Sequence, residues 1–151
     1  MELPEPASTP TAVPFSSTSR LPTAFSSHNS KEAFVSRLKS ISTASLNDGQ
    51  VSKPDPDIVL HGDPEFTTWP FIAETIQSGV WMATPGEHKV SRDGNTLEQF
   101  YILEGEIELH EQDIDVVRRY SAGDIVVIEP NFKGVWRTLS TVRKIYFTVK
   151  V

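Results

Sequence analysis

Short stretches in which apolar residues alternate with polar ones fill the C-terminal half of the chain. Glu106 to His110 is the clearest case, because Ile and Leu alternate with charged neighbours as in a half-buried β-strand. The Asp93-Gly94 dipeptide favours a tight hairpin, and turn residues recur at the spacing of about 8–12 residues that is typical of sandwiches and barrels. The pattern predicts an all-β, antiparallel jelly-roll barrel. Its strands are expected over residues 80–83, 87–92, 98–103, 106–110, 116–120, 125–128, 135–139 and 143–149.

The N-terminal part of the chain has a different pattern. Residues 1–29 are rich in Ser, Thr and Pro and predict a disordered tail, because they cannot bury enough apolar surface to offset the entropy of ordering. Further along, Phe34, Leu38 and Ile41 recur at helical spacing and predict one amphipathic helix. A Pro-containing linker follows. The expected segments are therefore a tail over 1–29, the helix and linker over 30–59, and a β-domain over 60–151.

Composition limits the classes of function. The chain has 151 residues, a formal net charge of -6 and a pI near 5.2, which argue against a nucleic-acid-binding surface because such surfaces cluster Lys and Arg. It has no cysteine, which excludes disulfides, iron–sulfur clusters and cysteine nucleophiles. No apolar run is long enough to span a membrane, and the first residues lack the features of a secretory signal. We therefore expect a cytoplasmic protein that does not bind a membrane.

The size of the β-domain predicts self-association. A domain of ~90 residues buries only about 60–65% of its unfolded surface. Tyr101 and Leu103 share the parity of the outward face on their strand. We therefore expect a homodimer in which the partner covers these outward apolar side chains.

A framework of glycines and one carboxylate resembles the first motif of the cupin superfamily. Its members here are Gly86, Arg92, Gly94, Glu98 and Gly105. In that motif, the second and third of these positions are histidines that bind a divalent metal, and the glutamate is a further ligand. The resemblance implies a cupin in which only the carboxylate is retained.

The second cupin motif shows a similar loss. The run from Gly123 to Ile128 resembles its start, and its last histidine would fall on Gly134. The family pattern usually has proline at the position of Glu129 and glycine at Asn131, whereas here the proline is Pro130. We therefore expect a reshaped turn at this point.

Several blocks narrow the resemblance to small single-domain cupins related to (S)-ureidoglycine aminohydrolase and to the ethanolamine-utilisation cupin. They follow one another in order along residues 60–151, so the resemblance implies the cupin fold for this whole segment. The blocks are Gly62-Asp63-Pro64, Ser78 to Trp81, Thr84-Pro85-Gly86, EQFYILEG from Glu98 to Gly105, Phe132 to Trp136, and Val142 to Tyr146.

Strand parity predicts which side chains face the barrel interior. If Arg92 and Glu98 point inward, as the motif implies, then His88 and Phe100 do so as well. Trp136 follows the parity of Gly134. An interior with apolar walls and a few polar groups is typical of a small-molecule site. We predict Glu98 as the catalytic residue and substrate contacts from Trp81, His88, Arg92, Phe100, Lys133, Trp136 and Lys144.

The same residues argue against a metal or another cofactor. A transition-metal site needs three or four converging ligands, and the sequence offers mainly Glu98 and His88. His88 precedes Arg92 by about 13 Å along an extended strand, too far to replace the lost histidine. Arg92 would also repel a cation. We expect no metal and no cofactor.

Three functions stay open. A buried Glu98 must be paired or protonated, with Arg92, Lys133 or Lys144 as candidate partners. It is therefore a structural ion pair, an acid/base group, or a group that receives a cationic or amide part of a ligand. The first hypothesis is a metal-independent cupin that binds a small polar metabolite, with acid/base chemistry of the isomerase, lyase or hydrolase type at Glu98. The second is a metal-dependent cupin of the aminohydrolase or dioxygenase type with an unusual ligand set around Glu98 and His88. The third is a non-catalytic module that recruits a partner through the N-terminal helix and tail.

Overall fold

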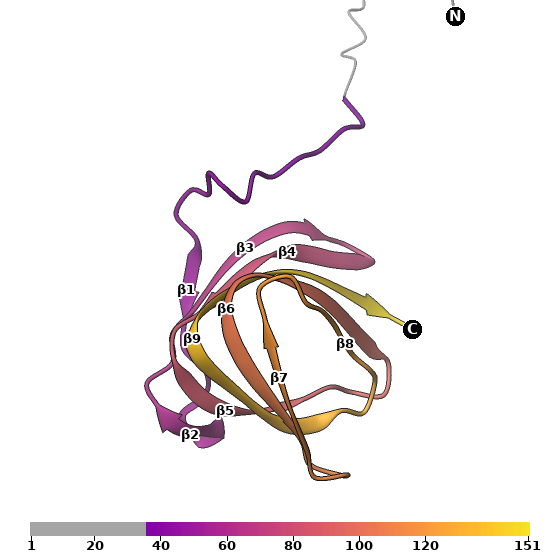
Figure 1. Ribbon diagram of the computed structural model, residues 1–151. Helices are drawn as coiled ribbons and strands as arrows, with labels where there is room; N and C mark the ends of the chain where they lie inside the picture. Colours follow the sequence, from indigo (N-terminus) through magenta and orange to yellow (C-terminus); the bar gives the residue numbers. More distant parts are fainter. Residues whose placement is uncertain (1–35) are drawn as a thin grey trace, which may run out of the picture. The chain divides into compact units, whose positions relative to one another are not determined.

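A computed structural model of the chain describes residues 36–151 (Figure 1). This range contains nine β-strands and a short 3-10 helix, η1 (Pro56–Ile58), and no α-helix. None of its helices is long and apolar enough to cross a membrane. In chain order the strands are β1 (Gln50–Ser52), β2 (Val59–Gly62), β3 (Phe66–Ala73), β4 (Ile76–Ala83), β5 (Gly86–Ser91), β6 (Thr96–Glu111), β7 (Val116–Ser121), β8 (Ile125–Ile128) and β9 (Lys133–Lys150).

Two long strands, β6 and β9, organise the sheet. They pair with each other from Thr96–Lys150 to Glu111–Gly134. The C-terminal half of β9 also pairs with β4, and its N-terminal half with β5. One part of the sheet therefore runs β1-β3-β4-β9-β6-β8, and the other runs β2-β5-β9-β6-β7. All pairings are antiparallel, and the sheet curls round into a barrel (Figure 1), which confirms the predicted antiparallel β-architecture.

Each long strand replaces two shorter ones that the sequence predicts. The expected strands over 98–103 and 106–110 are both parts of β6, and those over 135–139 and 143–149 are both parts of β9. The β6–β9 register shifts repeatedly between Ile102 and Ile107. Gly105 lies within this irregularity at φ 86°, and a Cβ there would lie 2.3 Å from the carbonyl oxygen of Thr141. Glycine thus lets the strand pass through the bend without ending.

The tight hairpin predicted at Asp93-Gly94 is wrong. β5 pairs with β2 and β9, whereas β6 pairs with β7, β8 and β9. The connecting segment is tied instead to the loop before β9: the Arg92 N–H donates to the Phe132 carbonyl at 2.9 Å, and the Asn131 N–H donates to the Asp93 carbonyl at 3.0 Å. Asn131 has φ 67°, a left-handed conformation that asparagine tolerates. It thereby serves where the family pattern has glycine.

The predicted N-terminal helix is not present in the part of the chain that is described. Residues 36–49 form turns and extended segments, and Leu38 is 88% exposed. Ser and Thr side chains are frequent here and compete for backbone hydrogen bonds, which weakens helices. The segment is bound to the sheet instead, through Trp69 Nε1 to the Asn47 carbonyl (2.7 Å) and Arg143 Nη1 to the Thr43 carbonyl (3.1 Å). Phe34 and the predicted tail lie outside the described residues.

The segment expected to be a linker also belongs partly to the sheet. Val51 and Ser52 complete β1, which pairs with β3, and η1 follows directly after Asp55. The Asp55 side chain accepts the N–H of Asp57 at 3.0 Å and caps η1. Pro56 at the first helical position needs no N–H partner there.

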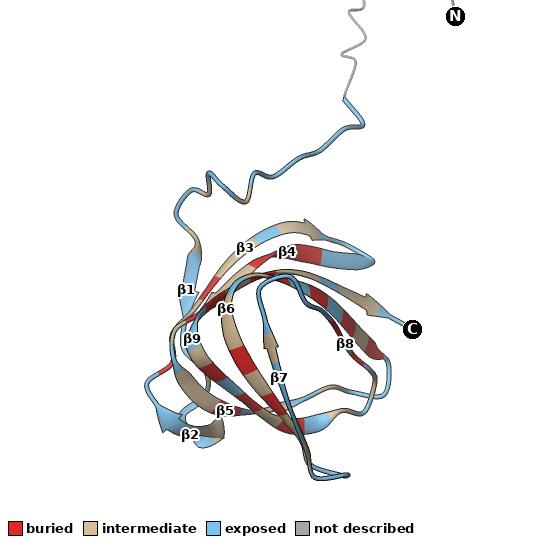
Figure 2. Ribbon diagram, in the orientation of Figure 1, coloured by how far each residue is buried: buried red, intermediate tan, exposed pale blue. Residues whose placement is uncertain are grey.

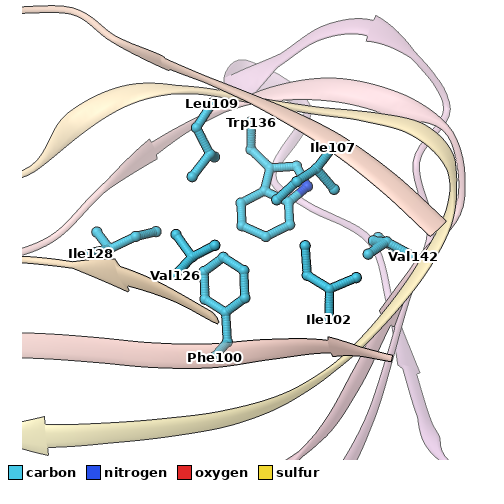
Figure 3. Packing of buried hydrophobic residues seen from close by; sticks show 9 residues of the cluster. Phe100, Ile102, Ile107, Leu109, Val126, Ile128, Trp136 and Val142 are labelled. Atoms are coloured by element: carbon cyan, nitrogen blue, oxygen red, sulfur yellow. The ribbon is translucent and has the colours of Figure 1, made fainter. Parts of the chain in front are cut away.

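Burial along β6 alternates as the strand parity predicts. Glu98, Phe100 and Ile102 are buried, whereas the residues between them are exposed (Figure 2). The Phe100 and Trp136 rings approach within 5.5 Å between centroids, and Figure 3 shows them among aliphatic side chains. Burying each such aliphatic or phenyl side chain stabilises the fold by about 1.5–3 kcal/mol. The core consists of Ala83, Phe100, Ile102, Ile107, Leu109, Val126, Ile128, Trp136 and Val142.

Candidate functional site

A cavity of about 780 Å³ opens into the barrel between β3, β4, β5, β6 and β9. Its inner wall carries the side chains that strand parity places inside, because β6 and β9 lie side by side and each turns alternate residues inward. Trp136 belongs to both the cavity and the core. The lining residues with polar or aromatic chemistry include Phe66, Trp81, His88, Lys89, Arg92, Glu98, Gln112, Lys133, Trp136, Lys144 and Tyr146.

A carboxylate between two cations lies in the cavity wall. Lys144 Nζ donates to Glu98 Oε1 at 2.7 Å, and Arg92 Nε donates to Glu98 Oε2 at 3.0 Å. Arg92 Nη2 also contacts Oε2. The side chains of Glu98 and Lys144 are 5% and 6% exposed, and that of Arg92 is 23% exposed. The carboxylate is therefore fully paired, with two of the three partners that the sequence suggests.

Aromatic rings surround the buried ammonium group. Lys144 Nζ lies 4.8 Å from the ring centroid of Trp81, 4.1 Å from that of Phe100 and 4.5 Å from that of Trp136. Such distances allow cation–π attraction, which is strongest where the cation is desolvated. The register explains the position: Lys144 on β9 is paired with Trp81 on β4 and with Ile102 on β6. The aromatic residues thus hold the ammonium group at the cavity wall.

The charges of this cluster fix its protonation. Burial alone would raise the pKa of the Glu98 carboxyl, but the charges of Lys144 and Arg92 and their hydrogen bonds outweigh it and lower the pKa to about 2. Burial lowers the pKa of Lys144, and Glu98 opposes this shift. Glu98 is therefore ionised at neutral pH.

His88 lies next to this cluster as a neutral imidazole. Burial, followed by the positive charges of Lys144 and Arg92, lowers its pKa from 6.5 to about 4. Its ring lies 5.0 Å from Phe66 and 6.4 Å from Trp136 between centroids. The buried Nδ1 has no hydrogen-bond partner among the described residues. His88 therefore has a free polar atom for a ligand.

The low pKa of His88 predicts that acid destabilises the protein. Between pH 6.5 and about 4 the unfolded chain binds a proton at this residue that the folded chain does not. Stability should therefore fall as the pH decreases through this window, by at most about 1.4 kcal/mol per pH unit from this group. Urea unfolding at pH 7, 6 and 5 measures the slope. His88→Gln should flatten it. An equal slope in the variant would contradict the assignment. Because the pKa of Glu98 is lowered from 4.5 to about 2, the stability that this residue contributes is lost at lower pH, as the pH falls from 4.5 to about 2.

All eight predicted site residues lie in or directly beside the cavity. Seven of them line it, whereas Phe100 packs in the core and contacts the lining residues Lys144 and Trp136. Lys133 lies at the exposed rim, away from Glu98's hydrogen bonds. Tyr146 and Thr148 were not predicted, although they share the parity of Lys144. Ile58 of η1 also lines the cavity, and nothing in the sequence pattern indicates this.

Comparison with known proteins identifies the fold family. Residues 73–146 match the model of the EutQ-like cupin domain. A protein of unknown function from Pseudomonas syringae is 27% identical, with a TM-score of 0.59, over 70% of this chain and 45% of its own. The Clostridium difficile EutQ protein is 15% identical, with a TM-score of 0.52, over 70% of this chain and 98% of its own.

Residues 36–151 have the cupin fold. Ectoine synthase from P. lautus has the same fold, with a TM-score of 0.51 and 14% identity over 65% of this chain and 68% of its own. No curated protein matches in sequence. The chain spans less than half the length of the Pseudomonas protein. The finer resemblance to (S)-ureidoglycine aminohydrolase stays a prediction.

The residues present do not fit the divalent metal that the cupin motif holds. Both oxygens of Glu98 are engaged by cations, and a metal ion would have to displace them against their charge. The other motif positions, Arg92, Gly94 and Gly134, provide no ligand atom. Among residues 36–151 there is no group of three or more His, Asp or Glu side chains placed to hold a metal ion. No chemical step is therefore assigned to a metal.

Proposed function

We propose that this cupin binds a small polar metabolite inside its barrel without a metal. The observation that carries the proposal is the pairing of Glu98 with Lys144 and Arg92, which turns the former ligand position into an ion cluster. The cavity volume lies within the range of about 300–1,000 Å³ that is usual for small-molecule sites. Its aromatic walls are typical of such sites as well.

Glu98 is best suited to hold the two cations in place. With a pKa of about 2 it has no proton to donate at neutral pH, and it is a weak base. Lys144 and Arg92, which keep unused N–H groups, are the direct ligand contacts in this proposal. Isomerase, lyase or hydrolase chemistry at Glu98 stays a prediction. So does a role as an interaction module, because residues 1–35 lie outside the described part.

Metal analysis tests the proposal. Protein purified without chelators should contain far less than one metal ion per chain by elemental mass spectrometry. Addition of Mn²⁺, Fe²⁺, Ni²⁺ or Zn²⁺ should leave the melting temperature unchanged, because a ligand that binds the folded state would raise it. A content near one ion per chain that disappears in Glu98→Gln and in His88→Ala would instead support the metal-dependent alternative.

We further propose that this cupin forms a homodimer through the outer face of β8, β6 and β9. Tyr101 is paired with Ile125 and Ile145 across these strands, and Gln99 is flanked in the same way by Val127 and Phe147. The apolar side chains therefore form one continuous patch. Exposed patches of this kind often mark protein–protein contacts. Tyr101 is 40% exposed, Ile125 66%, Val127 48% and Phe147 48%.

A charge in this patch should dissociate the dimer. We expect wild-type protein to sediment as a dimer and Phe147→Glu as a monomer, because the contact would bury an unpaired carboxylate. Val117→Glu is the control, since Val117 is exposed on β7 outside the patch. Analytical ultracentrifugation at micromolar concentration measures the mass. A wild-type monomer, or dissociation of both variants, would contradict this interface.

A further inference from the structure

The ion cluster in the cavity wall has one positive charge that no described residue neutralises. Lys144 and Arg92 share the single carboxylate of Glu98. His88 is neutral at pH 7 and adds nothing. Excess charge in a buried site is unfavourable unless a counter-charge accompanies it. With Lys144 protonated, which its 2.7 Å contact with Glu98 favours, the cluster is therefore electrostatically incomplete by one anion.

The other charged residues that line the cavity are also positive. Lys89 and Lys133 also line it, and Glu98 is the single acidic residue among the described lining residues. The lining thus combines four cations with one anion, in a chain whose formal net charge is -6. The low pKa of His88, caused in part by Lys144 and Arg92, reports the same positive potential inside the cavity. Such local fields concentrate ligands of the opposite charge.

Hydrogen-bond donors remain for an anion. A guanidinium group has five N–H donors. In Arg92, Nε and Nη2 bind Glu98, and Nη1 donates to the Ser91 carbonyl at 3.1 Å, so each terminal nitrogen keeps one N–H. Two parallel N–H groups of arginine match a carboxylate. Lys144 Nζ has three N–H groups and uses one for Glu98.

We propose that the ligand is a small monoanion: a carboxylate that Arg92 and Lys144 bind, carried on a flat apolar body that packs against Trp81 and Trp136. This inference rests on the proposed function and adds the charge and shape of the ligand to it. A single negative charge matches the single uncompensated positive charge of the cluster. The rings of Trp81 and Trp136 lie 5.5 Å apart at 81° and provide an apolar corner beside the cations. A neutral or cationic analogue would leave the cluster unbalanced.

Matched probes separate charge from shape. One set is benzoate, benzamide and benzylamine, and a second is indole-3-acetate, indole-3-acetamide and tryptamine. Each set keeps the ring and replaces the carboxylate with an uncharged amide of nearly the same shape or with a positively charged amine. Isothermal titration calorimetry at millimolar probe concentrations measures affinity. For the benzoate set, whose members carry no indole, tryptophan fluorescence also reports binding near Trp81 and Trp136, because the third tryptophan, Trp69, does not line the cavity. The carboxylate of each set should bind about tenfold or more tightly than its amide, as for hydrogen bonds to charged groups, and the amine should bind most weakly.

Variants test where the anion binds. Arg92→Gln and Lys144→Met should each weaken carboxylate binding about tenfold or more and reduce the difference between acid and amide. Arg119→Gln is the control, because it also removes one cation but lies on β7, paired with Glu106. It should bind the probes like wild type. Circular dichroism verifies that each variant is folded, and Arg92→Gln keeps the test open if Lys144→Met does not fold.

The outcomes distinguish the two proposals. If amides or amines bind as tightly as carboxylates and the fluorescence responds, the cavity is a ligand site but the monoanion inference is wrong. If the carboxylates bind but Arg92→Gln and Lys144→Met leave their affinity unchanged, the inference is also wrong. If no probe of either set binds, the proposed binding function fails and the inference fails with it.

Discussion

Replacing Glu98 with glutamine is expected to lower the free energy of unfolding by about 3–5 kcal/mol. The substitution keeps the shape of the side chain and removes the one negative charge in contact with Lys144 and Arg92. Lys144 is buried among aromatic rings and has no other acidic partner there. Two cations would then share a poorly hydrated site without compensation, or Lys144 would have to fold without its proton. Urea unfolding monitored by circular dichroism measures the loss.

Lys144→Met is the complementary variant, because it removes one of the two cations of the cluster and keeps the carboxylate. It leaves the one-to-one pair of Arg92 and Glu98 and replaces a buried ammonium group with an apolar side chain of similar length. Replacing buried charges with apolar side chains can be neutral or stabilising where no charge is left unpaired. Glu98 keeps Arg92 as its partner, so we expect stability equal to or above that of wild type, with anion binding lost. Glu106→Gln, in an exposed pair with Arg119, should leave the melting temperature nearly unchanged. A loss of less than about 1 kcal/mol in Glu98→Gln would show that the cluster is not structural.

The contrast between these variants bears on function. If Lys144→Met stabilises the fold, then the wild-type lysine is a group that lowers stability, and binding sites commonly contain such groups. Glu98 would then act as a positioning residue whose main effect is to keep two cations inside an apolar barrel. If Glu98 acted instead as a catalytic base, Glu98→Gln would abolish turnover because the base itself is missing, and not because the two cations are displaced. A binding measurement with Arg92→Gln separates these effects, because that variant keeps the Glu98–Lys144 pair.

Strand parity predicted which side chains of β6 near Glu98 point inward, for a physical reason. The motif fixes Glu98 on the inner face, and a period of two then fixes Phe100 and Ile102 without further information. The same rule placed Trp136 correctly from Gly134. Parity carries over between β6 and β9 only within each regular stretch, because the register shifts between Ile102 and Ile107 and the buried face of β6 changes parity there. The sequence did not determine which cations pair with Glu98. In the structure these cations are Arg92 and Lys144, whereas Lys133 forms no ion pair with Glu98.

The parts that could not be predicted depend on contacts distant in sequence. β3 contains Pro70, which usually disfavours an internal strand, and the register shifts directly after it. The continuity of β6 through Gly105 depends on the close approach of Thr141, which no local pattern reveals. The helix expected around Leu38 is not present in residues 36–49, where Ser and Thr side chains compete for the backbone hydrogen bonds of a helix. These errors concern the strand boundaries and the periphery, and leave the cavity wall intact.

Two lost ligand positions, Gly134 and Gly94, should respond very differently to alanine. A Cβ on Gly134 would lie 2.1 Å from the carbonyl oxygen of His110 and 2.8 Å from Phe132 Cζ. The first of these atoms belongs to the backbone of β6, which is paired with β9 at this point. We expect Gly134→Ala to destabilise the protein by about 3 kcal/mol or more, at the upper end of overpacking effects.

Gly94→Ala is the matched control. Its nearest neighbour would be the side-chain oxygen of Asn131 at 3.3 Å, which can move by rotation, and Gly94 lies outside the left-handed region. Alanine also restricts the unfolded chain, which favours folding by about 0.4–1 kcal/mol at compatible sites. The net change should therefore be small. Urea unfolding of both variants under the same conditions measures the difference.

The difference in stability between Gly134→Ala and Gly94→Ala shows whether the backbone leaves room for histidines at these two motif positions. Histidine, like alanine, has a Cβ. A close approach that excludes alanine in place of Gly134 therefore excludes histidine as well. If Gly134→Ala unfolds the domain while Gly94→Ala does not, the β6–β9 contact itself prevents the last motif histidine. The loss of metal ligands is then built into the backbone and not only into the side chains. If Gly134→Ala is as stable as wild type, the close approach does not persist in solution. Gly134→His combined with Arg92→His and Gly94→His should in that case bind Zn²⁺ or Ni²⁺.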